Sequence, residues 1–100
     1  MMMQFAAEFF GTFVFLSVIL HATSPKNQWP NLAPLLIIFG LLAGIVVSAS
    51  GSGAHLNPAV SFMTYINGSM PLSTVGQYVS AQLLGAVAAV AVKAVMDGYK

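Results

Sequence analysis

The stretch from Ser48 to Val60 joins residues that favour irregular backbone to residues that start a helix. Its glycine- and serine-rich first part predicts that the backbone from Ser48 to Leu56 is extended and not helical. Asn57 then suits a helix N-cap, because its side-chain oxygen can accept a first-turn N–H, and Pro58 suits the first helical position. The next stop signal is Asn67-Gly68, a typical helix C-terminus. This predicts a helix of about ten residues, roughly 15 Å, or half of a bilayer core.

A half-helix of this kind brings two sorts of hydrogen-bonding group into one row. The irregular loop before Asn57 exposes backbone carbonyl oxygens as acceptors. The helix N-terminus adds a positive dipole end and unpaired N–H groups, and the Asn57 side chain adds an amide donor. Such a row passes a file of water molecules and repels cations and protons near the helix end. The residue types therefore indicate a pore for small neutral molecules.

The composition indicates a membrane protein. Of the 100 residues, 58% are hydrophobic and only 5% are charged, whereas soluble domains carry roughly 25% charged residues. Five charges cannot cover a soluble surface, and the lack of a basic patch excludes nucleic-acid binding. With no cysteine, no ligand cluster and no nucleophile–base pair, we expect neither a metal site nor a cofactor nor an enzyme activity.

Three apolar runs are long enough to cross a bilayer. The short helix between the second and third runs has no charge, whereas a helix lying at the membrane surface should carry a basic face, so a re-entrant half-helix is favoured. We expect an all-α, multi-pass integral membrane protein with one membrane domain over residues 1–100. Its expected segments are helices at about 2–22, 33–48 and 72–97, a re-entrant loop at 49–56 and a half-helix at about 57–67.

Small residues recur at four-residue spacing on two of the predicted spans. Gly40 and Gly44 lie on the second span, and Ala81, Gly85 and Ala89 lie on the third. This spacing lets a neighbouring helix approach closely. We therefore expect tight helix packing along both stripes.

The segment Ser52–Val60 resembles the first signature loop of the aquaporin and glyceroporin family almost residue for residue. Ala7–Thr12 resembles the family's first helix, Phe39–Leu41 its second and Tyr78–Gly85 its third. The resemblance covers essentially the whole chain. It implies half of the aquaporin fold, with three transmembrane helices and one re-entrant half-helix.

The resemblance also implies a role for individual pore residues. Asn57, in the motif Asn57-Pro58-Ala59, would be the amide donor at the pore centre. Phe39 matches the aromatic residue at the family's narrow filter, but its spacing to Asn57 is shorter than usual. Packing against lipid or core is an equal alternative for Phe39. The water file would be lined by the carbonyl oxygens of Gly53, Ala54 and His55.

Two polar residues of the spanning helices receive supporting roles from the same resemblance. Glu8 would be the buried carboxylate that braces the loop, and Gln82 would be its partner from the third helix. A lone carboxylate in a membrane helix needs such partners, because an unpaired one is costly. His55 is expected to form structural hydrogen bonds, since no second ligating residue is near it.

Family members have two inverted repeats, whereas this chain has one. It also has Val60 where the family's second motif is followed by a filter arginine. One chain therefore cannot close a pore of the family type. Either it is a truncated piece of a longer channel, or it pairs with an inverted copy of itself; its length favours the second.

The predicted function is a passive channel for water and small neutral solutes such as glycerol. Its expected partners are the lipid bilayer, these solutes and a second copy in an antiparallel, dual-topology homo-oligomer. The alternative is a non-conducting membrane protein that binds or inhibits a full-length channel. Lys26, Lys93 and Lys100 would share one side of the membrane, which favours the N-terminus outside. The residues do not indicate which membrane holds the chain.

Overall fold

The structure, a computed structural model, describes residues 2–98, so Lys100 lies outside the described part. Within these residues the fold is all-α and contains no strand. The helix α1, the segment formed by η1 and α2, and the helix α4 are each long and apolar enough to cross a membrane. In chain order the elements are α1 (Met2–Ala22), the 3₁₀ turn η1 (Pro30–Leu32), α2 (Ala33–Ser52), α3 (Pro58–Ile66) and α4 (Leu72–Met96).

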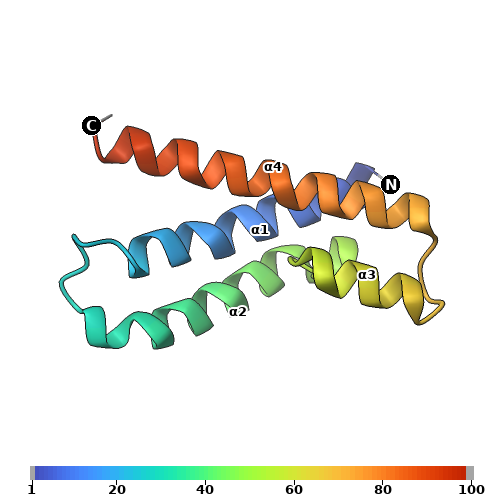
Figure 1. Cartoon of the computed structure of the whole chain (residues 1–100), viewed down its shortest axis with the longest axis horizontal. Helices are drawn as coiled ribbons and strands as arrows, with labels where there is room; N and C mark the ends of the chain where they lie inside the picture. The colour runs from blue at the N-terminus through green and yellow to red at the C-terminus, as the bar shows by residue number, and fades with distance from the viewer. Residues whose placement is uncertain (1, 99–100) are drawn as a thin grey trace.

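The helix α1 lies in the middle of the bundle, with α2 and α4 packed on either side of it (Figure 1). The short helix α3 packs against α4. After α2 the chain turns back, so that α3 starts about midway along the bundle and runs out to the end where α4 begins (Figure 1). With nine residues, α3 is about 14 Å long. This is the arrangement of a re-entrant half-helix beside three spanning helices.

Close contacts between the helices occur at glycines, which confirms the prediction from four-residue spacing. A Cβ atom added to Gly44 on α2 would lie 2.8 Å from the carbonyl oxygen of Gly11 on α1. A Cβ atom added to Gly85 on α4 would lie 2.8 Å from the carbonyl oxygen of Phe9. The alanines one turn before and one turn after Gly85 are fully buried. The backbone of α1 is therefore in almost direct contact with the backbones of α2 and α4.

The helix α2 is longer than the sequence predicts. We expected irregular backbone over residues 49–56, but α2 continues to Ser52, and only residues 53–57 are irregular. That boundary prediction is wrong. The physical reason is tertiary contact with α1, because a Cβ atom on Gly51 would lie only 2.7 Å from the Cβ of Ala7 and Ser52 donates a hydrogen bond to Glu8. Close packing outweighs the weak helix propensity of glycine and serine.

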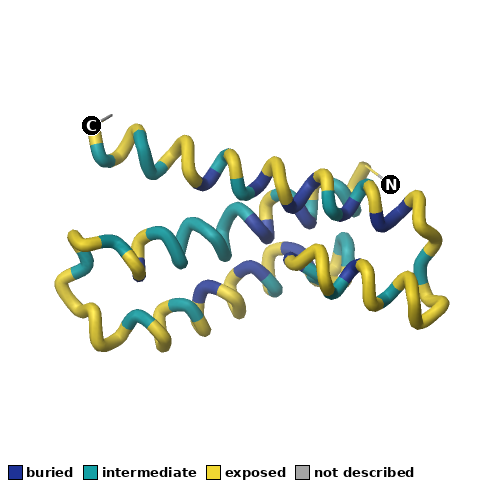
Figure 2. The backbone as a smooth tube through the Cα atoms, in the orientation of Figure 1, coloured by how far each residue is buried: buried dark blue, intermediate teal, exposed yellow. Residues whose placement is uncertain are grey.

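The buried residues gather on the inward faces of the helices, mainly in the half of the bundle that contains α3 (Figure 2). Much of this core is polar, which is unusual for side chains removed from water. Buried polar groups need partners, so these residues mark the place to look for a functional site. The buried polar or charged residues are Glu8, Thr12, Ser48, Ser61, Thr74 and Gln82.

Candidate functional site

Asn57 caps the N-terminus of α3 and leaves its amide NH₂ group without a partner in the described structure. Its side-chain Oδ1 accepts the backbone N–H of Ala59 at 2.7 Å. Its backbone carbonyl accepts the N–H groups of Val60 and Ser61 at 3.0 and 3.2 Å. Because the oxygen is held by the cap, the NH₂ group is oriented away from it. The tip of the half-helix therefore presents one fixed amide donor.

The loop before Asn57 has a strained backbone. Ala54 and Leu56 have φ values of 59° and 57°, in the left-handed region that costs a non-glycine residue about 1–2 kcal/mol. Gly53, with φ 83°, ends α2 in the same region. Within residues 2–98, the carbonyl oxygens of Gly53, Ala54 and His55 accept no hydrogen bond. The loop thus carries a series of free acceptors that ends at the Asn57 donor.

The Leu56 side chain anchors this loop between α1 and α2. It is only 4% exposed. Cβ atoms added to Gly11 and Gly44 would lie 2.7 and 2.9 Å from its Cδ2 and Cδ1 atoms. These two glycines leave the space that Leu56 fills. The strained conformation persists because the surrounding packing determines it.

The carboxylate of Glu8 receives four hydrogen bonds inside the bundle. Its Oε1 accepts the backbone N–H of Leu56 and the Nε2–H of Gln82, both at 2.8 Å. Its Oε2 accepts the backbone N–H of His55 at 2.9 Å and the hydroxyl of Ser52. Glu8 is fully buried, so these donors compensate for its lost hydration. One carboxylate therefore connects α1, the end of α2, the loop and α4.

A second set of contacts extends this network to α3 and α4. Nε2 of Gln82 also donates to Oγ of Ser61 at 3.2 Å, and that oxygen lies 2.9 Å from Nδ1 of His55. The hydroxyl of Tyr78 donates to the carbonyl of Ser52 at 2.7 Å, and its ring packs on His55 at a centroid distance of 4.7 Å. The loop is thus held by the Glu8 carboxylate from α1 and also by side chains of α3 and α4.

Three of these residues, Ser52, Ser61 and Tyr78, were not predicted as part of the site. The signal for two of them was helical spacing. Ser61 lies one turn after Asn57, and Tyr78 lies one turn before Gln82, so each shares a helix face with a predicted residue. Ser52 was missed because its segment was predicted to be a loop.

A cavity of about 260 Å³ opens beside the tip of α3. Two of its polar lining residues, Thr12 and Gln82, are each 2% exposed. Their Oγ1 and Oε1 atoms are buried without a hydrogen-bond partner in the described structure. Buried polar atoms of this kind usually have a partner. The rest of the lining is formed by Phe15, Leu16, Leu56, Asn57, Pro58, Leu83 and Ala86.

Residues 38–99 match the family model described as Major intrinsic protein. The chain belongs to this family. The Lens fiber major intrinsic protein of Lithobates pipiens is 43% identical over 89 residues, covering 86% of this chain and 34% of that protein. Aquaporin-2 of Dasypus novemcinctus is 39% identical over 89 residues, with coverage of 86% and 82%. Aquaglyceroporin-2 of Rhizophagus irregularis is 39% identical over 92 residues, with coverage of 86% and 29%.

The chain therefore spans about a third of the length of the first curated relatives that it matches. No solved structure matches it. The family match and the three apolar helices establish an integral membrane protein of the major intrinsic protein family.

In this major intrinsic protein, Phe39 lies on α2 outside the network around Asn57. Its side chain is 59% exposed, and it forms no aromatic pair within the described residues. An exposed ring on α2 fits either a pore filter or contact with lipid. The two alternatives for Phe39 therefore stay open.

Proposed function

We propose that this chain forms half of a passive channel for water and small neutral solutes. The observation that carries the proposal is the Asn57 side chain, whose oxygen caps α3 while its NH₂ group remains a free donor. The free carbonyl oxygens of residues 53–55 lead up to it along the loop. A water molecule moving along this series changes from acceptor contacts to a donor contact at the helix tip. The relatives named aquaporin and aquaglyceroporin support this function. We propose a channel and not an enzyme.

The pore requires a second half-repeat in the opposite orientation. The half-helix α3 covers about half of the membrane thickness, and irregular backbone at that depth needs cover from protein or water. The cavity beside Asn57 and Pro58 is lined by polar atoms that have no partner within residues 2–98, which supports contact with a further protein segment here. Apolar side chains of α3 are also exposed: Phe62 by 53%, Met63 by 59% and Ile66 by 66%.

We propose an inverted copy of the same chain as that second half, in an antiparallel, dual-topology dimer. Two Asn57 side chains then face one site at the membrane midplane from opposite sides. The chain covers only about a third of several relatives, so a longer channel that contains this segment is the alternative source of the second half. In either case the opposed N-termini of two half-helices repel cations at the midplane.

The proposed pore is permissive toward solutes larger than water. The sequence contains no arginine, so neither mouth of a homodimeric pore has a fixed guanidinium group that narrows it. We therefore propose passage of glycerol-sized neutral solutes alongside water. Cations are excluded by the opposed half-helix N-termini at the midplane, and their exclusion is weaker near the pore mouths.

Stopped-flow swelling of liposomes that contain only this chain tests the function. The native chain should accelerate both water and glycerol entry. Asn57→Ser keeps an oxygen that can cap α3, but it replaces the NH₂ group by a single hydroxyl donor on a side chain that is one atom shorter and does not reach as far into the pore. Loss of one hydrogen bond of about 1 kcal/mol should slow water entry roughly fivefold.

Asn67→Ser is the matched control, because Asn67 is an exposed asparagine at the other end of α3. It should leave both solute fluxes unchanged. Liposomes with the native chain that swell no faster than empty ones contradict a channel formed by this chain alone. If the same chain then changes the flux of a co-reconstituted full-length channel, a membrane interaction protein is the better description.

A further inference from the structure

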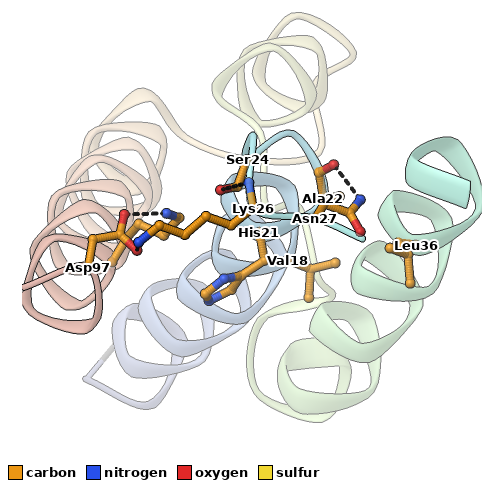
Figure 3. Close-up of a pocket in the computed structure, with 9 residues that line it drawn as sticks. Val18, His21, Ala22, Ser24, Lys26, Asn27, Leu36 and Asp97 are labelled. Carbon is orange, nitrogen blue, oxygen red and sulfur yellow. Dashed lines mark hydrogen bonds and ion pairs between the residues drawn. The ribbon is translucent and has the colours of Figure 1, made fainter. Parts of the chain in front are cut away.

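The end of the bundle opposite to α3 carries a cavity that the proposed pore does not use; most of its lining surface is apolar, but charged groups also line it. Three charged side chains line it: Lys93 from the last turn of α4, and Lys26 from the loop after α1 and Asp97 just beyond α4, which Figure 3 labels. The other charged side chain of the described residues, Glu8, is buried elsewhere. The cavity has a volume of about 340 Å³. Its apolar lining residues are Val18, Ala22 and Leu36.

The cavity has more cationic and donor groups than acceptors. Asp97 pairs with both ammonium groups, through Oδ1 with Lys26 at 3.3 Å and through Oδ2 with Lys93. Among residues 2–98, these two positive charges and one negative charge leave an excess of one positive charge at the cavity. The Ser24 hydroxyl and the His21 ring line the same cavity and donate no hydrogen bond to any residue from 2 to 98. These groups fit an anion that has several acceptor oxygens.

The cavity lies at the level of a membrane interface. The three spans end or begin around it, α1 at Ala22, η1 at Pro30 and α4 at Met96. Trp29, in the connecting loop, is 65% exposed, as expected for an aromatic residue among lipid headgroups. The Lys93 side chain is only 16% exposed, so its stem is covered while its ammonium group reaches the polar end.

We propose that this cavity binds the headgroup of an anionic phospholipid. The phosphate contacts the ammonium groups of Lys26 and Lys93, and an acyl chain follows the apolar surface of Val18 and Leu36. The single negative charge of a phosphatidylglycerol headgroup balances the single excess positive charge of the cavity. A zwitterionic lipid provides no such balance. The site requires only that the chain is inserted in a membrane, so it does not depend on the channel function.

Fluorescence quenching of Trp29 tests the proposal, because it is the only tryptophan in the chain. In vesicles of phosphatidylcholine, phosphatidylglycerol with brominated acyl chains should quench Trp29 at a several-fold lower mole fraction than brominated phosphatidylcholine does. Lys26→Gln should abolish this preference; Lys26 is 70% exposed, so the change leaves the fold intact. Lys93→Arg keeps the charge and should keep the preference. Equal quenching of the native chain by the two brominated lipids overturns the proposal.

A variant with the native net charge distinguishes a specific lipid site at Lys26 from general electrostatic attraction between the chain and anionic lipid. Lys26→Gln combined with Asn67→Lys restores the net charge but places the new lysine at the opposite end of the bundle (Figure 1). The preference for phosphatidylglycerol should remain lost, and its recovery contradicts a site at Lys26. Millimolar inorganic phosphate should not displace the lipid, and displacement would assign the cavity to a free anion instead. An inactive channel leaves all of these results unchanged.

Discussion

The carboxylate of Glu8 accepts the backbone N–H of Leu56 at 2.8 Å, although 48 residues separate the two in the chain. On the other side of the same residue, the Leu56 side chain fills the space that Gly11 and Gly44 leave open. The loop is therefore held by a polar contact and an apolar contact at one point. Its strained backbone depends on the packing of α1 against α2.

Replacing Glu8 tests how strongly it holds the loop. Glu8→Leu leaves the N–H groups of His55 and Leu56 buried without an acceptor, at about 1–3 kcal/mol for each group. We expect a loss of several kcal/mol in the free energy of unfolding, measured by reversible denaturation in mixed micelles. Glu8→Gln retains one acceptor oxygen, so its unfolding free energy should lie between those of the native chain and Glu8→Leu. Native stability in Glu8→Leu is the result that refutes this role.

The left-handed backbone at Ala54 predicts a stabilising glycine substitution. Ala54→Gly removes the penalty of φ 59° and should raise the unfolding free energy by up to about 1 kcal/mol, since the greater chain entropy of glycine offsets part of the gain. The matched control is Ala59→Gly in the first turn of α3, which should be destabilising. Both variants can be compared in one denaturation series. Equal losses in the two variants would show that Ala54 is not strained.

The contact between α1 and α4 predicts opposite outcomes for two glycines on one helix. A Cβ atom at Gly85 would lie 2.8 Å from the backbone oxygen of Phe9, whereas at Gly76 it would meet nothing within 4 Å. Gly85→Ala should therefore cost about 1–3 kcal/mol through overpacking. Gly76→Ala should be neutral or slightly stabilising. Thermal unfolding in detergent measures both, and an unaffected Gly85→Ala variant would rule out the close contact.

The ion pairs of Asp97, just beyond the end of α4, predict a loss of stability in acid. Hydrogen bonding from Lys93, and secondarily the contact with Lys26, holds the pKa of Asp97 below its ordinary value of 3.8. A carboxylate with a lowered pKa stabilises the folded state above pH 3.8, and this contribution disappears as the pH falls through the lowered value. The stability difference between the native chain and Asp97→Asn should therefore shrink below about pH 4, and also in high salt. A difference that does not change with pH contradicts the pairing.

Local sequence signals predicted the half-helix well. Asn57 as N-cap, Pro58 at the first position and Asn67 at the end are chemical signals that act within one turn, and α3 runs between them. The end of α2 could not be predicted in this way. It depends on contacts of Gly51 and Ser52 with α1, which are more than 40 residues away along the chain.

The network around Glu8 was predicted only in part, for a related reason. The hydrophobicity of α4 is nearly the same on all of its sides, so hydrophobic periodicity does not mark its inward face. Gln82 came from the family resemblance, and Tyr78, one turn away on the same face, was missed. Ser61 was missed although it follows Asn57 by one turn. The polar residues of a span become informative once one of them is assigned to the inward face.

Antiparallel pairing of two copies is the central claim, and the topology of the chain in intact cells tests it most directly. The sequence contains no cysteine, so Ser24→Cys and, separately, Ser69→Cys place a single thiol in loops at opposite ends of the bundle (Figure 1). A membrane-impermeant maleimide should label about half of the molecules in each variant before the membrane is permeabilised, because the two orientations are equally populated in such a dimer. Complete labelling of one position and none of the other would mean a single orientation and would contradict the inverted homodimer.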